Sequence, residues 1–315
     1  MEQIRERVEG NVGIIELINP PHNFMNSIMV RELDTLTLQW ETNPNISAII
    51  ITGGIEDIFI THYSVEEIVA LLSPLQKISR ALRGLTKLII CLLWWTYGFI
   101  ERMPMIMSVF ESVLRVTMFK GIMNLRGIHR VFTRLQYMQK PVIAAINGEA
   151  LGGGCELALS CDYRIMARGD YRIGLIETLL GIIPGAGGNI NLPRLVGPGR
   201  AVEMILDGTV VDPDQAQKIG LITKVVEKKD LMEESLKLAR RLSNRSMTSV
   251  RGVKRAVGLG ISSSRRRGMW IEKNLFINCG LSGSAQREGE AYLRYLKTGM
   301  RARDIYDILR KSGDV

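Results

Sequence analysis

Apolar runs of five to seven residues alternate with amphipathic stretches along this chain, which predicts strands interleaved with helices. Residues 4–8 and 11–17 lie on either side of Gly10-Asn11 and predict a β-hairpin. Further strands are predicted at 47–52, 142–146, 162–167 and 221–226, and helices after Ser27, over 155–160, after Asp212-Pro213 and over 229–243. Buried strands that alternate with helices indicate an α/β fold.

Residues 68–138 break this alternation and read as an apolar helical insertion. The longest uncharged run in it, Leu88–Ile100, has 13 residues, whereas a membrane-spanning helix needs about 20. Three interpretations stay open. The insertion packs as helices on its parent domain or on a neighbouring subunit, it lies in a membrane interface with 85–110 as an anchor, or it forms a lid or partner surface.

The charge of the chain narrows the choice of partners only a little. A net charge of +9 favours polyanions, which include nucleic acids, anionic membranes and small ligands that carry several phosphates. The basic residues are spread along the chain without an RNA-binding motif, so nucleic acid is not the expected partner. It remains an alternative through a basic group made of Arg251, Lys254, Arg255 and 265–267.

Cysteine and histidine usage predicts a reduced cytoplasmic protein, with peripheral membrane contact left open. The four cysteines include no CxxC pair, and the three histidines are scattered, so we expect neither disulfides nor a metal site. Residues 1–7 hold acids among bases and no apolar run, so we expect neither a secretory signal nor a transit peptide.

The candidate chemistry begins where the apolar strand 142–146 leads into three consecutive glycines, Gly152–Gly154. Glycines let a ligand approach the backbone closely, and the first turn of a helix offers free N–H groups and a partial positive charge. Such a turn suits the oxyanion of a thioester enolate. A purely structural turn would explain the glycines alone equally well.

A second motif follows at Glu177, in the pattern E-x-x-x-G-x-x-P-G-A-G-G that ends at Gly188. Together with GGGCEL, which contains Glu156, it closely resembles the crotonase superfamily of enoyl-CoA hydratases and isomerases, down to the spacing between the motifs. The resemblance covers the N-terminal strands and the stretch to about residue 245, extends weakly to 282–293, and leaves out only 68–138.

The resemblance implies a site with two carboxylates and an oxyanion hole. Gly153 and the backbone near Tyr63 would donate N–H groups to the thioester oxygen, and Glu156 and Glu177 would be the acid/base pair. An isomerase can work with the carboxylate at the Glu177 position alone, so two acids favour hydration. Taken separately, Glu156 could merely complement a helix dipole, and Glu177 could pair with Arg172.

The sequence departs from the family where CoA threads past the backbone. Small residues, Gly-Ala-Asp, are usual there, whereas this chain has His62, Tyr63 and Ser64. These side chains reshape the acyl pocket or place a hydroxyl or imidazole beside the reacting carbons; a steric role for His62 is favoured over a catalytic one. Further pocket candidates from the two motifs are Gly152, Pro184 and Gly185.

The resemblance therefore implies a crotonase fold, with stacked β-sheets in a spiral and flanking helices. We expect a core domain over 1–245 and a helical trimerisation region over 246–315, in trimers or dimers of trimers.

The expected substrate is an acyl-CoA thioester, and no cofactor is needed because proton transfer and oxyanion stabilisation suffice. An apolar, Met-rich insertion would suit a long or bulky acyl group. Isomerase, thioester hydrolase and non-catalytic roles, at a membrane or on nucleic acid, remain alternatives.

Overall fold

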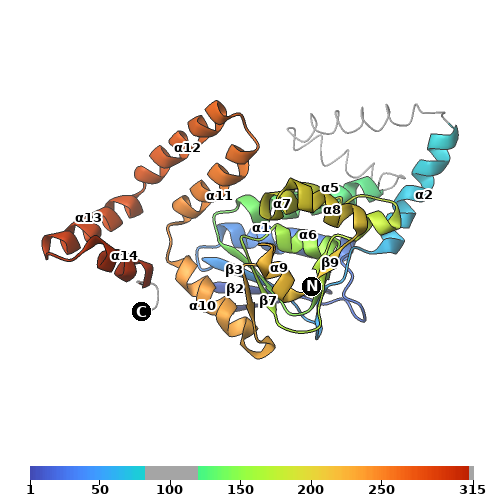
Figure 1. Cartoon of the computed structure of the whole chain (residues 1–315), viewed down its shortest axis with the longest axis horizontal. Coiled ribbons are helices and arrows are strands. Elements are labelled where there is room, and N and C mark those ends of the chain that lie inside the picture. Colours follow the sequence, from blue (N-terminus) through green and yellow to red (C-terminus); the bar gives the residue numbers. More distant parts are fainter. Residues whose placement is uncertain (82–119, 312–315) are drawn as a thin grey trace.

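The structure is a computed structural model that describes residues 1–81 and 120–311 (Figure 1). Its main sheet has six strands in the order β1-β2-β3-β5-β7-β10. The strands are β1 Ile4–Glu9, β2 Val12–Leu17, β3 Ala48–Gly53, β5 Val142–Ile146, β7 Tyr163–Ala167 and β10 Lys224–Val226. The predicted hairpin and strands are confirmed, although β10 is shorter than the apolar run 221–226 suggested.

Only the β1–β2 pair of this sheet is antiparallel, and every other neighbouring pair is parallel. Parallel strands need long crossover connections, which here are helices that cover the sheet. The inner strands are therefore buried, and this explains the uninterrupted apolar runs of β3 and β5, whose apolar residues lie in the hydrophobic core.

A second, four-stranded sheet has the order β4-β6-β8-β9, and its strands are short. They are β4 Ile58–Ile60, β6 Glu149–Leu151, β8 Ile173–Gly174 and β9 Val210–Val211. Strand β4 pairs in parallel with β6, and β6 with β8. This pairing matters for the site, because the chain leaving β4 and the chain leaving β6 end side by side.

The helices around the sheets include the four that the sequence places, after Ser27, over 155–160, after Asp212-Pro213 and over 229–243, and eight described helices that it does not place individually. They are α1 Ser27–Thr42, α2 Val65–Ala81, α5 Lys120–Tyr137, α6 Gly153–Leu159, α7 Gly188–Val196, α8 Pro198–Asp207, α9 Pro213–Lys218, α10 Leu231–Ser243, α11 Met247–Ile261, α12 Arg265–Gly280, α13 Gly283–Lys297 and α14 Ala302–Lys311. The Asp212 carboxylate caps α9 as predicted, by accepting the N–H of Gln215. The cap of α1 is Asn26 rather than Ser27, because the Asn26 side chain accepts from Ile28 and Met29.

The two ends of the predicted insertion lie in α2 and α5, which flank the core (Figure 1). The proposed membrane anchor at 85–110 lies outside the described residues. Among the helices that are described, none combines the length and the apolar character that crossing a bilayer requires. Beyond α10, α11 lies against the core, where Lys254 contacts Leu135 and Asp162, and helices α12–α14 extend away from the sheets (Figure 1).

Candidate active site

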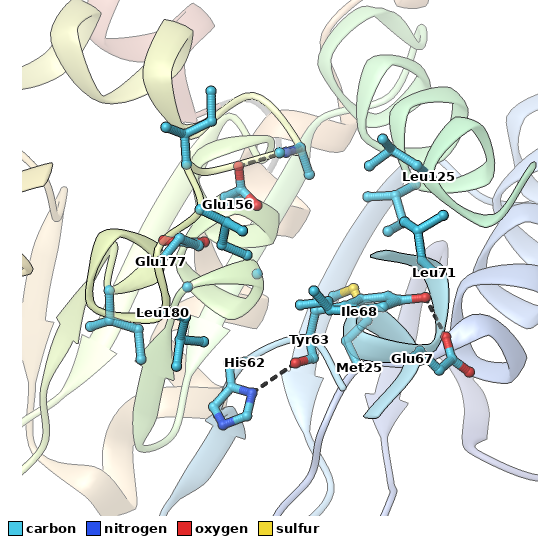
Figure 2. A pocket seen from close by; sticks show the side chains of 18 of the residues that line it. Met25, His62, Tyr63, Glu67, Ile68, Leu71, Leu125, Glu156, Glu177 and Leu180 are labelled. Atoms are coloured by element: carbon cyan, nitrogen blue, oxygen red, sulfur yellow. Dashed lines mark hydrogen bonds between the residues drawn. The ribbon is translucent and has the colours of Figure 1, made fainter. Parts of the chain in front are cut away.

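A cavity of about 260 Å³ lies between two walls that come from distant parts of the sequence (Figure 2). One wall carries Glu156, Glu177 and Leu180, from α6 and the short 3-10 helix Glu177–Leu180. The opposite wall carries Tyr63 and apolar side chains of α2 and α5. The apolar lining consists of Met25, Ile68, Leu71, Leu72, Leu125, Ile128, Phe132, Ile176, Leu180, Ile182, Ile183 and Ala186.

Glu156 is buried in the first turn of α6 and still reaches the cavity. Its Oε1 accepts the N–H of Ala186 at 2.7 Å and that of Gly188 at 2.8 Å, where α7 begins. Burial, followed by the negative charge of Glu177, raises the pKa of Glu156 to about 7, although the two N–H groups favour the ionised form. Near neutral pH this carboxyl can therefore take up or release a proton.

Glu177 opens the 3-10 helix that lies on the same wall of the cavity as α6 (Figure 2). Its Oε2 is buried and has no hydrogen-bond partner within residues 1–81 and 120–311. Burial raises its pKa above the usual range. The alternative of a pair with Arg172 is not what the structure has, since the Arg172 guanidinium pairs with Asp170 at 2.8 Å.

Tyr63 and Gly153, the two residues expected to donate backbone N–H groups, line the same cavity. Tyr63 forms a parallel bridge with Met25, in which the Met25 N–H donates to His62 O and the Ser64 N–H donates to Met25 O. In such a bridge the N–H of the central residue points to the opposite side of the strand. A Cβ placed on Gly153, the first residue of α6, would lie 3.3 Å from Tyr63 N. Tyr63 N and the Gly153 backbone therefore lie close together at the cavity.

The other predicted pocket residues divide into two groups. His62, Gly152 and Gly185 line the cavity. The His62 ring turns away from the carboxylates, stacks on Phe24 with ring centroids 4.4 Å apart, and contacts Tyr63 O through Nδ1 (Figure 2).

Ser64 and Pro184 have other contacts. The Ser64 hydroxyl accepts the Glu67 N–H at the start of α2, which is a helix-cap interaction. Pro184 packs behind the wall, with its Cβ 2.8 Å from the point where a Gly188 Cβ would stand. The Tyr63 hydroxyl points to Glu67 and away from Glu156 and Glu177, so it is not beside the reacting carbons (Figure 2).

The sequence analysis missed Met25 and Glu67, both of which line the cavity. Glu67 accepts the N–H and the hydroxyl of Ser27, and also the hydroxyl of Tyr63. The pattern Ser64-x-x-Glu67 is typical of a capping box and could have placed the start of α2. No local signal predicts the contact between Glu67 and Ser27, because 40 residues separate them.

Comparisons with known proteins agree with this geometry. The sequence model of the enoyl-CoA hydratase/isomerase family matches residues 123–300. A short-chain-enoyl-CoA hydratase of Clostridium acetobutylicum is 31% identical over 272 residues, which are 86% of this chain and 87% of that protein. A crotonyl-CoA hydratase of Syntrophomonas wolfei is 43% identical over 168 residues, which are 53% of this chain and 63% of that protein.

A solved structure gives the same result for the fold. The enoyl-CoA hydratase of Bacillus anthracis superimposes with a TM-score of 0.71 at 27% identity, over 94% of this chain and 96% of that one. The α/β fold is therefore the one these hydratases have, as the two motifs implied. The family match covers more than half of the chain and includes both of its motifs, so the chain is an enzyme that belongs to the enoyl-CoA hydratase/isomerase family.

Proposed function

We propose that this protein adds water across the 2,3 double bond of an enoyl-CoA thioester, and removes water in the reverse direction. The observation that carries the proposal is the meeting of Glu156 and Glu177 at one cavity, beside the N–H groups of Tyr63 and Gly153. One carboxylate would suffice for an isomerase, which only moves a proton from one carbon to another. Two carboxylates with raised pKa values provide both proton transfers that hydration needs.

Each group has a role in this mechanism. The Tyr63 and Gly153 N–H groups donate to the thioester oxygen and stabilise the negative charge that develops on it. Ionised Glu156, held by two backbone N–H groups, takes a proton from water, and the hydroxide bonds to the β-carbon. Protonated Glu177 gives its proton to the α-carbon. A proton then passes from Glu156 to Glu177, so the net reaction is the addition of one water molecule.

Crotonyl-CoA is the substrate with which to test this first. Two relatives carry the names crotonyl-CoA hydratase and short-chain-enoyl-CoA hydratase, and the cavity is lined almost entirely by apolar side chains. The expectation of a long or bulky acyl group stays a prediction. It rests on the apolar residues that α2 and α5 contribute to the cavity, such as Leu71 and Leu125.

The decisive experiment follows the loss of enoyl-thioester absorbance when purified protein is mixed with 2-enoyl-CoAs of increasing length. We expect Glu156→Gln and Glu177→Gln each to lower kcat by about 10²-fold or more. Glu149→Gln is the matched control, because Glu149 is half-buried, also has a pKa raised by burial, and lies outside the cavity lining. Isomerisation of a 3-enoyl-CoA or thiol release without hydration would instead favour the isomerase or the thioester hydrolase.

We propose further that the protein assembles through its C-terminal helices. None of the residues of α12 or α13 is buried in the single chain. Large apolar side chains are exposed there, including Trp270, Phe276 and Leu281. Exposed apolar surface of this extent is typical of an interface between subunits. The trimer that the family resemblance implies is the assembly we expect.

A further inference from the structure

The side chain of Tyr63 occupies a place in the cavity that the proposed mechanism does not use. Its backbone N–H serves the thioester oxygen, whereas its ring extends along the wall opposite Glu156 and Glu177 (Figure 2). The ring lies near Met25 and Ile68, and its hydroxyl points away from the carboxylates (Figure 2). The usual family residue at this position is alanine, so the Tyr63 ring fills space in the pocket that an alanine would leave open.

Hydrogen bonds hold this ring in place. The Tyr63 hydroxyl donates to Glu67 Oε2, and Glu67 Oε1 accepts the Ser27 hydroxyl at 2.8 Å. The Ser27 N–H also donates to Glu67 Oε2 at 3.0 Å. Glu67 therefore joins the start of α2, the start of α1 and the Tyr63 ring, so that the ring cannot swing aside without breaking a partly buried hydrogen bond.

The backbone of Tyr63 is fixed as firmly as its ring. The parallel bridge to Met25 uses two hydrogen bonds, of 2.9 Å from Met25 N to His62 O and of 2.7 Å from Ser64 N to Met25 O. A ring that is fixed at both ends is a rigid wall rather than an adaptable one. Rigid walls discriminate between substrates by shape, because the substrate cannot displace them.

The ring lies where it meets the reacting end of the acyl group. When the Tyr63 N–H binds the thioester oxygen, the α-carbon is one bond from the carbonyl carbon, and so it is among the acyl atoms closest to the Tyr63 side chain. The carboxylates of Glu156 and Glu177 occupy the other wall. A substituent on the α-carbon therefore has the Tyr63 ring on one side and the catalytic carboxylates on the other.

We propose that Tyr63, fixed by Glu67, is a specificity-determining residue that admits unbranched 2-enoyl groups and excludes those substituted at the α-carbon. The proposal rests on the proposed hydratase function and names the substrate class of that same site. Acyl chains of the accepted class extend from the reacting carbons along the apolar side chains of α2 and α5, such as Leu71 and Leu125.

The test compares kcat/KM for crotonyl-CoA with kcat/KM for its 2-methyl derivative. A single added methyl group in a fitted apolar pocket changes kcat/KM by about 10–200-fold, and we expect a preference for crotonyl-CoA in this range. Tyr63→Ala keeps the backbone N–H and restores the usual family residue, and we expect it to lower the preference at least about tenfold. Tyr63→Phe keeps the ring and should keep most of the preference.

A matched control comes from a second tyrosine–carboxylate pair. The Tyr171 hydroxyl donates to Asp57, and neither residue lines the cavity, so Tyr171→Phe should leave the preference unchanged. Should Tyr63→Ala fail to fold, as judged by its melting curve, Tyr63→Val provides the same comparison. An unchanged preference in a folded Tyr63→Ala or Tyr63→Val variant, or no preference in the native protein, would overturn the proposal.

A binding measurement separates this proposal from the proposed function. Calorimetry with butanoyl-CoA and 2-methylbutanoyl-CoA needs no turnover, because neither thioester can be hydrated. If the native protein hydrates no enoyl-CoA, the hydratase proposal fails, and the ratio of these two dissociation constants still tests Tyr63. We expect the native protein to bind butanoyl-CoA more tightly and Tyr63→Ala to bind both about equally; equal binding by the native protein contradicts the assignment.

Discussion

Gly153 and Gly154 are neighbours in the first turn of α6, but a side chain at each would contact different atoms. A Cβ on Gly154 would lie 2.1 Å from Ile60 O, a backbone atom of β4 that cannot move alone. A Cβ on Gly153 would lie 3.3 Å from Tyr63 N, in the space proposed for the thioester oxygen. One glycine is therefore needed for packing, and the other for access to the oxyanion donors.

This difference predicts opposite outcomes for two alanine variants. Gly154→Ala should lower the free energy of unfolding by about 3 kcal/mol, as overpacking against fixed atoms does. Gly153→Ala should change stability by less than about 1 kcal/mol, since alanine favours a helix, but should lower kcat by about 10²-fold. Urea unfolding and initial rates with crotonyl-CoA measure both quantities. Equal stability losses in the two variants would contradict the assignment of Gly153.

The pKa of Glu156 links stability to pH. Burial raises this pKa from 4.5 to about 7 in the folded chain, so the folded state binds a proton more tightly than the unfolded state does. The resulting stabilisation is complete below pH 4.5 and is lost as the pH rises through 7. We expect Glu156→Gln, whose amide oxygen can still accept from Ala186 and Gly188, to gain stability relative to the native protein between pH 5 and pH 8, by about 3 kcal/mol at most.

Urea unfolding at pH 5 and pH 8 checks this, with Glu234→Gln as the control. Glu234 is a carboxylate whose pKa is lowered by its hydrogen bond to Lys224, so it is ionised in both states above pH 5, and Glu234→Gln should differ from the native protein by nearly the same amount at the two pH values. A stability difference between Glu156→Gln and the native protein that does not vary with pH would show that Glu156 titrates near its ordinary value.

The residues that carry the candidate chemistry could be found from the sequence because they lie in contiguous motifs. Glu156, Glu177 and Gly153 belong to two strings of residues, and the structure brings these strings together at one cavity. Glu67 could not be found in this way, since its partners Ser27 and Tyr63 are fixed by tertiary packing. Periodicity cannot tell which of two neighbouring polar residues caps a helix, so the sequence places a helix after Ser27 without showing that Asn26 is its cap.

At the scale of elements, a buried lysine attaches α11 to the core. Lys254 Nζ donates to Asp162 Oδ2 at 2.7 Å, to Leu135 O at 2.8 Å and to Lys140 O at 3.1 Å. Asp162 also accepts the N–H of Val142, where β5 begins. Lys254 belongs to the basic group that would bind nucleic acid in the alternative reading. Its contacts within the protein make it a structural residue, so that basic group has one residue fewer for binding a nucleic acid.

Removing this lysine leaves the partly buried Asp162 carboxylate with the Val142 N–H but without its charged partner. We expect Lys254→Met to lower the free energy of unfolding by about 2–3 kcal/mol, and Lys254→Met with Asp162→Asn to recover part of the loss. Arg251→Met, on the exposed side of the same helix, should change stability by less than about 0.5 kcal/mol. Chemical unfolding of the four proteins measures this; a loss equal to that of Arg251→Met would mean that α11 does not depend on Lys254.

At the scale of the whole molecule, the strands of the main sheet could be predicted from the sequence, but the short strands of the second sheet and the way the two sheets meet could not. Alternation of apolar runs fixes which segments are buried, and the family motifs imply the fold. The pairing of β4 with β6 joins residues about 90 positions apart, and it is this pairing that brings Tyr63 to Gly153. The part of the insertion between α2 and α5 lies outside the described residues, so its three interpretations remain predictions.

The arrangement of the C-terminal helices makes a last prediction, about assembly. Phe276 is 77% exposed and Leu281 is 82% exposed in the single chain, on helices that extend away from the core (Figure 1). Burying about 100 Å² of each such side chain would contribute roughly 2–3 kcal/mol, so an interface through these residues is expected.

Sedimentation velocity should give a trimer or a dimer of trimers for the native protein. Phe276→Glu combined with Leu281→Glu should shift it towards the monomer, because a buried, unpaired carboxylate is costly. A charge change outside these helices and outside the insertion, Val8→Glu on β1, is the control and should leave the assembly intact, since Val8 is also exposed. A native protein that sediments as a monomer would contradict the prediction.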